Sequence, residues 1–131
     1  MPLKVKKAPD DHESYQQLGD HFYRKKLISE AIEQYQISLR INPEEVNVLI
    51  NLGVCYALTK KYDQAIDLFL KAIKLTPNNA NIYLNLGNVY GSLGKHDIAA
   101  DYFKKALELN PEFEAAYNNL NYALKAKEGK K

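Results

Sequence analysis

The sequence repeats itself with a period of 34 residues, and this feature constrains the fold more than any other. Leucine recurs at Leu18, Leu52, Leu86 and Leu120, and proline at Pro43, Pro77 and Pro111. Four further columns keep the same register: Gly19, Gly53 and Gly87; Phe22, Tyr56 and Tyr90; Ala31, Ala65 and Ala99; Tyr35, Phe69 and Phe103. Six columns in one register predict structural units that stack on one another.

Each repeat unit is predicted to form two helices. In the second unit, apolar residues recur at helical spacing over 49–56 and again over 65–73. The second helix of each unit should end at the residue before proline, namely Asn42, Thr76 and Asn110. Ser29, Asp63 and Asp97 are expected to cap the starts of these helices. No segment alternates with period two for long enough to indicate a sheet.

The recurring small residues predict close helix contacts. Glycine in a helix costs roughly 1 kcal/mol against alanine, so its recurrence indicates a compensating close approach. We expect the three glycines of the column to face the alanines of the next helix, Ala31, Ala65 and Ala99. The larger Tyr and Phe residues are expected to fill the wider spaces between helices.

The pattern resembles the tetratricopeptide repeat family. Its signature is present as Tyr15, Leu18, Gly19, Phe22, Ala31, Tyr35, Ser38 and Pro43, and it recurs over 49–77 and 83–111. The resemblance implies an all-α fold, a right-handed α-solenoid of three helix-turn-helix repeats at 12–45, 46–79 and 80–113. A capping helix at 114–127 completes the single domain, 12–127. Residues 1–11 are expected to form a disordered tail and 128–131 a basic tail.

Composition and charge exclude several classes of protein. Hydrophobic residues make up 46% and charged residues 26%, which is too apolar for a disordered chain. The net charge is +2, and the excess of positive charge comes from the lysines near the two ends of the sequence. The body between them lacks the clustered Lys and Arg that would indicate a nucleic-acid partner. No apolar run is long enough to predict membrane insertion, and no signal peptide is visible. A single cysteine, Cys55, fits a cytoplasmic location.

We predict no catalytic residues, no cofactor and no metal site. Three histidines and one cysteine cannot form a convincing zinc site. His21 and Cys55 share a column, but a Cys–His nucleophile also needs an orienting group and an oxyanion site. The segment 91–96 only superficially resembles a phosphate loop, because His96 replaces the Ser or Thr that would meet magnesium. The sequence therefore favours a non-catalytic module.

The resemblance implies a concave groove lined by the first helix of each repeat. Its predicted peptide-binding residues are Gln17, Asn47, Ile50, Asn51, Val54, Asn81, Leu84, Asn85, Asn88, Asn119 and Tyr122. The column Asn51, Asn85 and Asn119 resembles the asparagine ladders of O-GlcNAc transferase and kinesin light chain. An amide offers both a donor and an acceptor, as a peptide group does. The column is equally consistent with hydrogen bonds between helices or to solvent.

The leading functional hypothesis is an adaptor or scaffold that binds an extended, weakly charged segment of another protein in this groove. The tails of Hsp70 and Hsp90 are not expected as ligands, because Asp20 stands where a clamp for carboxylates needs asparagine. The alternative hypothesis is a structural assembly unit that self-associates through an uncapped N-terminal end carrying Tyr15, Leu18 and Phe22.

Overall fold

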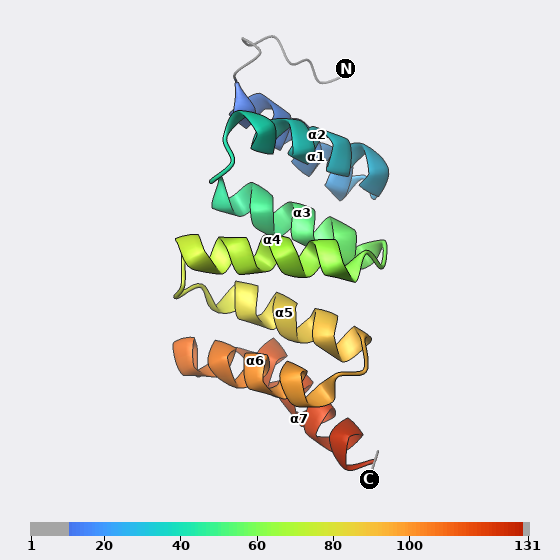
Figure 1. The fold of residues 1–131 in the computed structure, drawn as a ribbon, viewed down its shortest axis with the longest axis vertical. Helices are drawn as coiled ribbons and strands as arrows, with labels where there is room; N and C mark the ends of the chain where they lie inside the picture. The colour runs from blue at the N-terminus through green and yellow to red at the C-terminus, as the bar shows by residue number, and fades with distance from the viewer. Residues whose placement is uncertain (1–10, 130–131) are drawn as a thin grey trace. The chain divides into compact units, whose positions relative to one another are not determined.

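The computed structural model describes residues 11–129, and within them the chain forms seven α-helices and no strand. The predicted all-α fold of three helical hairpins and a terminal helix is confirmed (Figure 1). The helices are α1 (His12–Arg24), α2 (Ile28–Ile41), α3 (Val46–Leu58), α4 (Tyr62–Leu75), α5 (Ala80–Ser92), α6 (His96–Leu109) and α7 (Glu114–Glu128). The predicted tail 1–11 falls outside the described residues except for Asp11, and Lys130 and Lys131 of the predicted basic tail also fall outside them.

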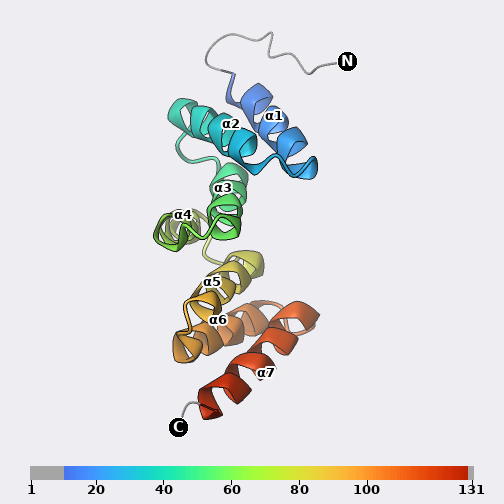
Figure 2. The same ribbon diagram turned by 90° about the vertical axis from the view of Figure 1, so that its right-hand side faces the viewer.

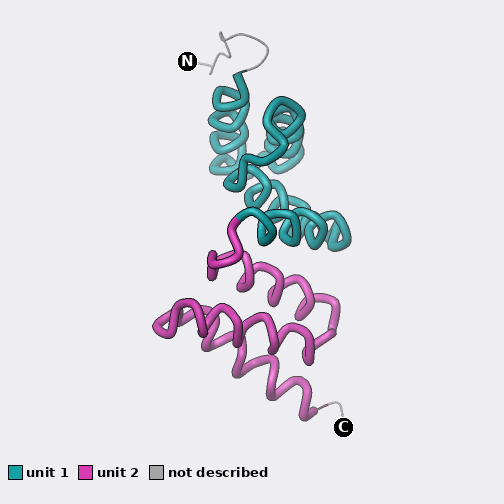
Figure 3. The backbone as a smooth tube through the Cα atoms, turned by 60° about the vertical axis from the view of Figure 1, so that its left-hand side comes forward, with its two compact units in different colours: residues 1–75 teal, residues 76–131 magenta. Residues whose placement is uncertain are grey.

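The chain divides into two compact units, 1–75 and 76–131 (Figure 3). In the first unit α1 pairs with α2 and α3 with α4, and α2 also contacts α3. In the second unit α5 pairs with α6, and α7 packs on α6 and touches α5. Figure 2 shows the hairpin of α1 and α2 and that of α5 and α6 from the side.

Each unit has its own hydrophobic core. In the first, Ala31 and Tyr35 of α2 are buried with Val48, Leu52 and Cys55 of α3. In the second, the buried cluster consists of Ala99, Ala100, Phe103 and Ala123, from α6 and α7. The repeated columns of the sequence therefore supply the core in both units.

The second helix of each repeat ends next to the residue that precedes proline, as the sequence predicts. α2 and α6 end one residue before Asn42 and Asn110, and both asparagines act as C-caps. The Asn42 side chain then accepts a hydrogen bond from the Glu44 amide at 3.3 Å, and Asn110 does the same for Glu112 at 3.3 Å. The asparagine that precedes proline thus closes the turn into the next repeat.

The predicted N-caps are wrong, because α2, α4 and α6 begin earlier than Ser29, Asp63 and Asp97. The residue before α2 is Leu27 and that before α6 is Lys95, and neither makes a side-chain cap. Asp63 and Asp97 lie instead in the first turn, where a negative charge favours the helix dipole.

The turn inside each hairpin explains the early start. Lys26, Lys60 and Gly94 adopt left-handed backbone conformations, with φ of 64°, 64° and 77°. In the first turn the Leu27 amide donates to the Phe22 carbonyl at 2.9 Å, and the same bond recurs 34 and 68 residues later. This is a Schellman motif, which satisfies the last carbonyls of one helix and leads directly into the next.

The nearest neighbours of the glycines are aromatic side chains, each four residues after a member of the alanine column. A Cβ on Gly19 would lie 2.6 Å from a ring carbon of Tyr35, and one on Gly53 would lie 2.7 Å from Phe69. Gly87 has the same relation to Phe103. Each aromatic ring therefore lies against the backbone of the first helix, at a place where only glycine fits.

Candidate functional site

The predicted groove residues are all at least partly accessible. Exposed residues are Gln17, Asn47, Asn81, Asn88 and Tyr122; half-buried residues are Ile50, Asn51, Val54, Leu84, Asn85 and Asn119. Five of these eleven belong to the first unit and six to the second. Two groups of them make side-chain contacts inside their own unit.

In the first unit, Asp20 of α1 accepts two hydrogen bonds. The Tyr35 hydroxyl of α2 donates to its Oδ1 at 2.5 Å, and Asn51 Nδ2 of α3 donates to the same oxygen at 3.3 Å. The carboxylate is therefore shared by three helices, and it links the first hairpin to the next. One N–H of Asn51 is used between repeats, which is one of the roles that the sequence left open.

Burial, together with the nearby carboxylate of Asp20, raises the pKa of two groups. Burial is the main reason why the pKa of Tyr35 lies well above its ordinary value, and the hydrogen bond to Asp20 adds to the shift. Burial also raises the pKa of the Cys55 thiol to about 11, with a further contribution from the charge of Asp20. Both groups are thus held in the neutral form, and an inert thiol does not suit nucleophilic chemistry.

In the second unit, an equivalent bond joins α5 and α7. Asn119 Nδ2 donates to Asn88 Oδ1 at 2.8 Å. The two residues are 31 positions apart, as are Asp20 and Asn51. The ninth residue of one repeat therefore binds the sixth residue of the next in both units. Sequence reasoning missed this pairing, although two polar pairs at a spacing of 31 were a visible signal.

Asn85, the middle member of the asparagine column, behaves differently. Within the described part of its own unit, residues 76–129, its side chain makes no hydrogen bond, and it is half-buried on α5.

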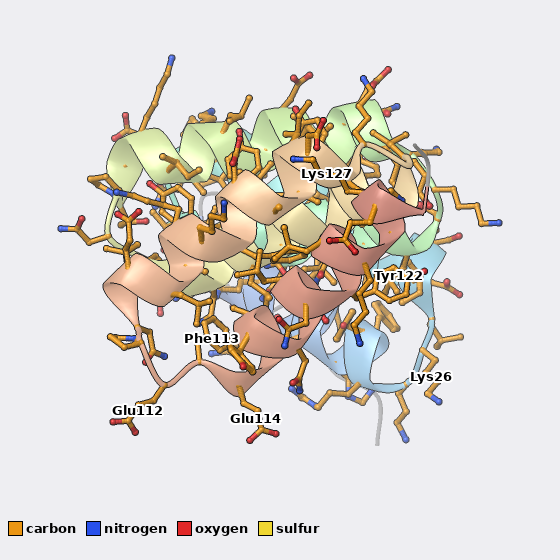
Figure 4. The ribbon with its side chains drawn as sticks, turned by 90° about the horizontal axis from the view of Figure 1, so that it is seen from below. Lys26, Glu112, Phe113, Glu114, Tyr122 and Lys127 are labelled. Carbon is orange, nitrogen blue, oxygen red and sulfur yellow. The ribbon has the colours of Figure 1, made fainter. Side chains whose placement is uncertain are left out.

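A pocket of about 320 Å³ lies among α5, α6 and α7. Its lining includes three predicted residues, Asn88, Asn119 and Tyr122, together with His96 and the ring of Phe103. The Tyr122 ring projects from α7 and is 71% exposed (Figure 4). It meets the His96 ring edge-on, with centroids 6.4 Å apart. The second unit thus carries a small polar and aromatic depression beside its asparagines.

The predicted N-terminal end face is less exposed than expected. Tyr15, Leu18 and Phe22 are all half-buried, and Phe22 packs against the core of the first unit. Self-association through this end stays a prediction.

The described residues hold no group of three or more His, Cys, Asp or Glu side chains placed to bind a metal ion. Within the same residues, no helix has the length and apolar content that crossing a membrane requires.

Comparison with known proteins identifies relatives of the whole repeat array. The family model described as "Tetratricopeptide repeat" matches residues 44–112. A crystal structure of MamA protein is 28% identical with a TM-score of 0.86, and the alignment covers 91% of this chain and 65% of that chain. The chain thus spans less than two thirds of that protein. A search of curated proteins gave no match.

Two further solved structures share the fold. The first TPR of Spaghetti (RPAP3), bound to the HSP90 peptide SRMEEVD, is 21% identical with a TM-score of 0.85, covering 94% of this chain and 98% of that one. The Arabidopsis OM64 TPR domain is 23% identical with a TM-score of 0.83, covering 87% and 94%.

Proposed function

The chain belongs to the tetratricopeptide repeat family, and from this premise we propose that it is a non-catalytic module that binds an extended segment of a partner protein. The proposed surface is formed in each unit by the first helices of its repeats, which are α1 and α3 in the first unit and α5 and α7 in the second. The observation that carries the proposal is that accessible amides lie on these helices within each unit, accompanied by half-buried aliphatic side chains.

The composition of this surface suits a peptide main chain. Each amide presents a donor and an acceptor, and Ile50, Val54 and Leu84 offer apolar contacts beside them. A hydrogen bond contributes only about 0.5–1.5 kcal/mol net, while a micromolar complex needs about 8 kcal/mol. The aliphatic side chains must therefore supply much of the affinity.

Charge argues for a ligand different from that of one structural relative. The RPAP3 domain holds a peptide of HSP90 that ends in aspartate. In this chain Asp20 accepts from Tyr35 and Asn51, so its negative charge is fixed on the proposed surface. A second carboxylate there would be repelled. We therefore propose a weakly charged segment as the ligand.

The test is selection of peptides followed by blocking of the surface. Phage displaying random dodecapeptides are selected on the wild-type chain, and the dissociation constants of synthetic copies are measured by fluorescence anisotropy. Asn47→Arg combined with Asn81→Arg should weaken binding at least tenfold, because both positions are exposed on the proposed surface.

The matched control adds the same charge elsewhere. Ser29→Arg combined with Gln64→Arg also changes two exposed residues, one on α2 and one on α4. This variant should bind like the wild type. Equal losses in both variants, or a library that yields no binder, would contradict the proposed function.

A further inference from the structure

We infer that the pocket among α5, α6 and α7 binds an aromatic side chain, which the partner's extended segment supplies. The pocket lies within the second unit alone. The source of the aromatic side chain rests on the proposed function, whereas the pocket and its chemistry do not. The inference therefore adds to the proposed surface a site that selects one kind of ligand residue.

The size and the lining of the pocket both suit an aromatic ring. Its volume of about 320 Å³ lies at the lower end of the range typical of small-ligand sites. Three rings from two helices line it: Phe103 and His96 of α6 and Tyr122 of α7. Aromatic rings pack edge-to-face or offset on one another more favourably than the buried area alone predicts. A ligand ring would meet such partners on several sides.

Tyr122 has an aromatic surface that the chain leaves uncovered. Its side chain is 71% exposed, and its ring meets the His96 ring edge-on, with centroids 6.4 Å apart. Figure 4 shows this side chain projecting from α7. A large aromatic side chain with this exposure gains apolar contact when a second ring lies against it. The wall that Tyr122 forms is therefore incomplete without a ligand.

Small residues of the third repeat leave the space open. Gly91 and Ser92 line the pocket, and a Cβ at Gly91 would have its nearest heavy atom 4.0 Å away, on Ala99. Larger residues stand at the equivalent positions of the other two repeats: Tyr23 and Arg24, and Ala57 and Leu58. Glycine weakens a helix, and no close contact requires it at position 91. The open space therefore favours a ligand.

The charge of the pocket favours an uncharged ligand group. Among the described residues that line it, none is Asp, Glu, Lys or Arg. Asn119 donates to Asn88 at 2.8 Å, and this bond holds both amides at the edge of the pocket. A charged side chain would lose hydration here without gaining an ion pair, whereas an aromatic ring loses little. The side chains of Phe, Tyr and Trp meet this requirement.

The direct test uses a small aromatic probe and needs no peptide. N-acetyltryptophanamide is titrated into the isotope-labelled chain, and the backbone amide signals of Gly87 and Asn119 are followed by NMR. Both residues line the pocket, so their signals should shift along a saturable curve. N-acetylleucinamide, the aliphatic control, should move them much less. Unmoved signals, or equal shifts with the two probes, would overturn the inference.

A variant that fills the pocket locates the probe. Gly91→Tyr gives the third repeat the residue that the first repeat has at the equivalent position, Tyr23, so the fold is expected to tolerate it. The new side chain should occupy the space of the probe and abolish the shifts of the Gly87 and Asn119 signals. Shifts that persist in a folded Gly91→Tyr chain would place the probe elsewhere and overturn the inference.

Peptides connect the pocket to the proposed function. Dodecapeptides selected on the wild-type chain should share an aromatic residue, and replacing it with alanine should weaken binding about tenfold. Tyr122→Ala should weaken binding of the unchanged peptide about fivefold. Tyr117→Ala is the matched control, because Tyr117 is a second exposed tyrosine of α7 that does not line the pocket. This variant should bind like the wild type.

The outcomes separate the two proposals. If the arginine pair on the surface weakens peptides that need no aromatic residue, the inference is overturned and the proposed function stands. Equal losses in Tyr122→Ala and Tyr117→Ala lead to the same conclusion. If the library yields no binder while the aromatic probe still shifts the signals of the pocket, the proposed function is lost and the pocket stands as a site for a free aromatic molecule.

Discussion

The ring of Phe69 lies against the backbone of Gly53, so that a Cβ at this glycine would approach the ring to 2.7 Å. The same relation joins Gly19 to Tyr35 and Gly87 to Phe103. Each hairpin is thus closed by an aromatic residue of its second helix that fills the space left by a glycine of its first.

Gly53→Ala should therefore destabilise the chain by about 1–3 kcal/mol, because the Phe69 ring must move out of a buried position. Gly91→Ala is the control, since the nearest heavy atom to a Cβ there is 4.0 Å away and alanine favours the helix by about 1 kcal/mol. Urea unfolding followed by circular dichroism measures both. Equal effects of the two substitutions would contradict the explanation.

Lys26→Gly should stabilise the first hairpin by about 0.5–1 kcal/mol, since a left-handed conformation costs a residue with a Cβ roughly 1–2 kcal/mol. Lys26 has φ of 64°, and glycine already stands at the equivalent position, Gly94. Lys25→Gly serves as comparison, because Lys25 has φ of −84° and gains nothing. The thermal midpoints of the two variants should move in opposite directions.

Tyr35→Phe should lower the free energy of unfolding by about 1–3 kcal/mol, because the partly buried carboxylate of Asp20 loses one donor and keeps, among the described residues, only Asn51. Tyr102→Phe is the matched control: Tyr102 stacks on Tyr90, with ring centroids 5.6 Å apart, and its hydroxyl makes no hydrogen bond to another residue of the described part. Denaturant titration should show a loss for the first variant and almost none for the second.

Stability should fall as the pH rises above 9. The pKa of Cys55 is raised from 9.0 to about 11 by burial, so the unfolded chain loses this proton first and the folded state is favoured less. The contribution of the protonated Cys55 thiol to the free energy of unfolding is complete below pH 9 and declines by about 2–3 kcal/mol towards pH 11. The raised pKa of Tyr35 acts in the same direction above pH 10. Cys55→Ala should flatten the dependence between pH 9 and 11; an unchanged slope would refute the assignment.

The sequence predicted the helices because the period of 34 residues and the prolines are local signals. Asn42 and Asn110 end their helices as expected, since proline restricts the residue before it. The prediction that Ser29 and Asp97 cap their helices was wrong, because the left-handed residue of each Schellman turn lets the next helix begin one residue before them. The aromatic neighbours of the glycines were not predicted, because spacing alone does not tell which side chain of the facing helix lies closest.

The candidate site was predicted only in part. Helical spacing correctly indicated that Asn85 and Tyr122 are accessible, because exposure follows from the face of a helix. The bonds of Asn51 to Asp20 and of Asn119 to Asn88 depend on how successive hairpins pack, which no single helix encodes. Whether the predicted residues bind a peptide stays a prediction.

Cys55, the only cysteine of the sequence, is fully buried in the core of the first unit, and its thiol is held protonated. A thiol-modifying reagent can reach it only when the packing of the core around α3 opens. The rate of modification therefore measures how often the first unit opens locally, and no engineered label is needed. A ligand that bridges α1 and α3 would slow this modification.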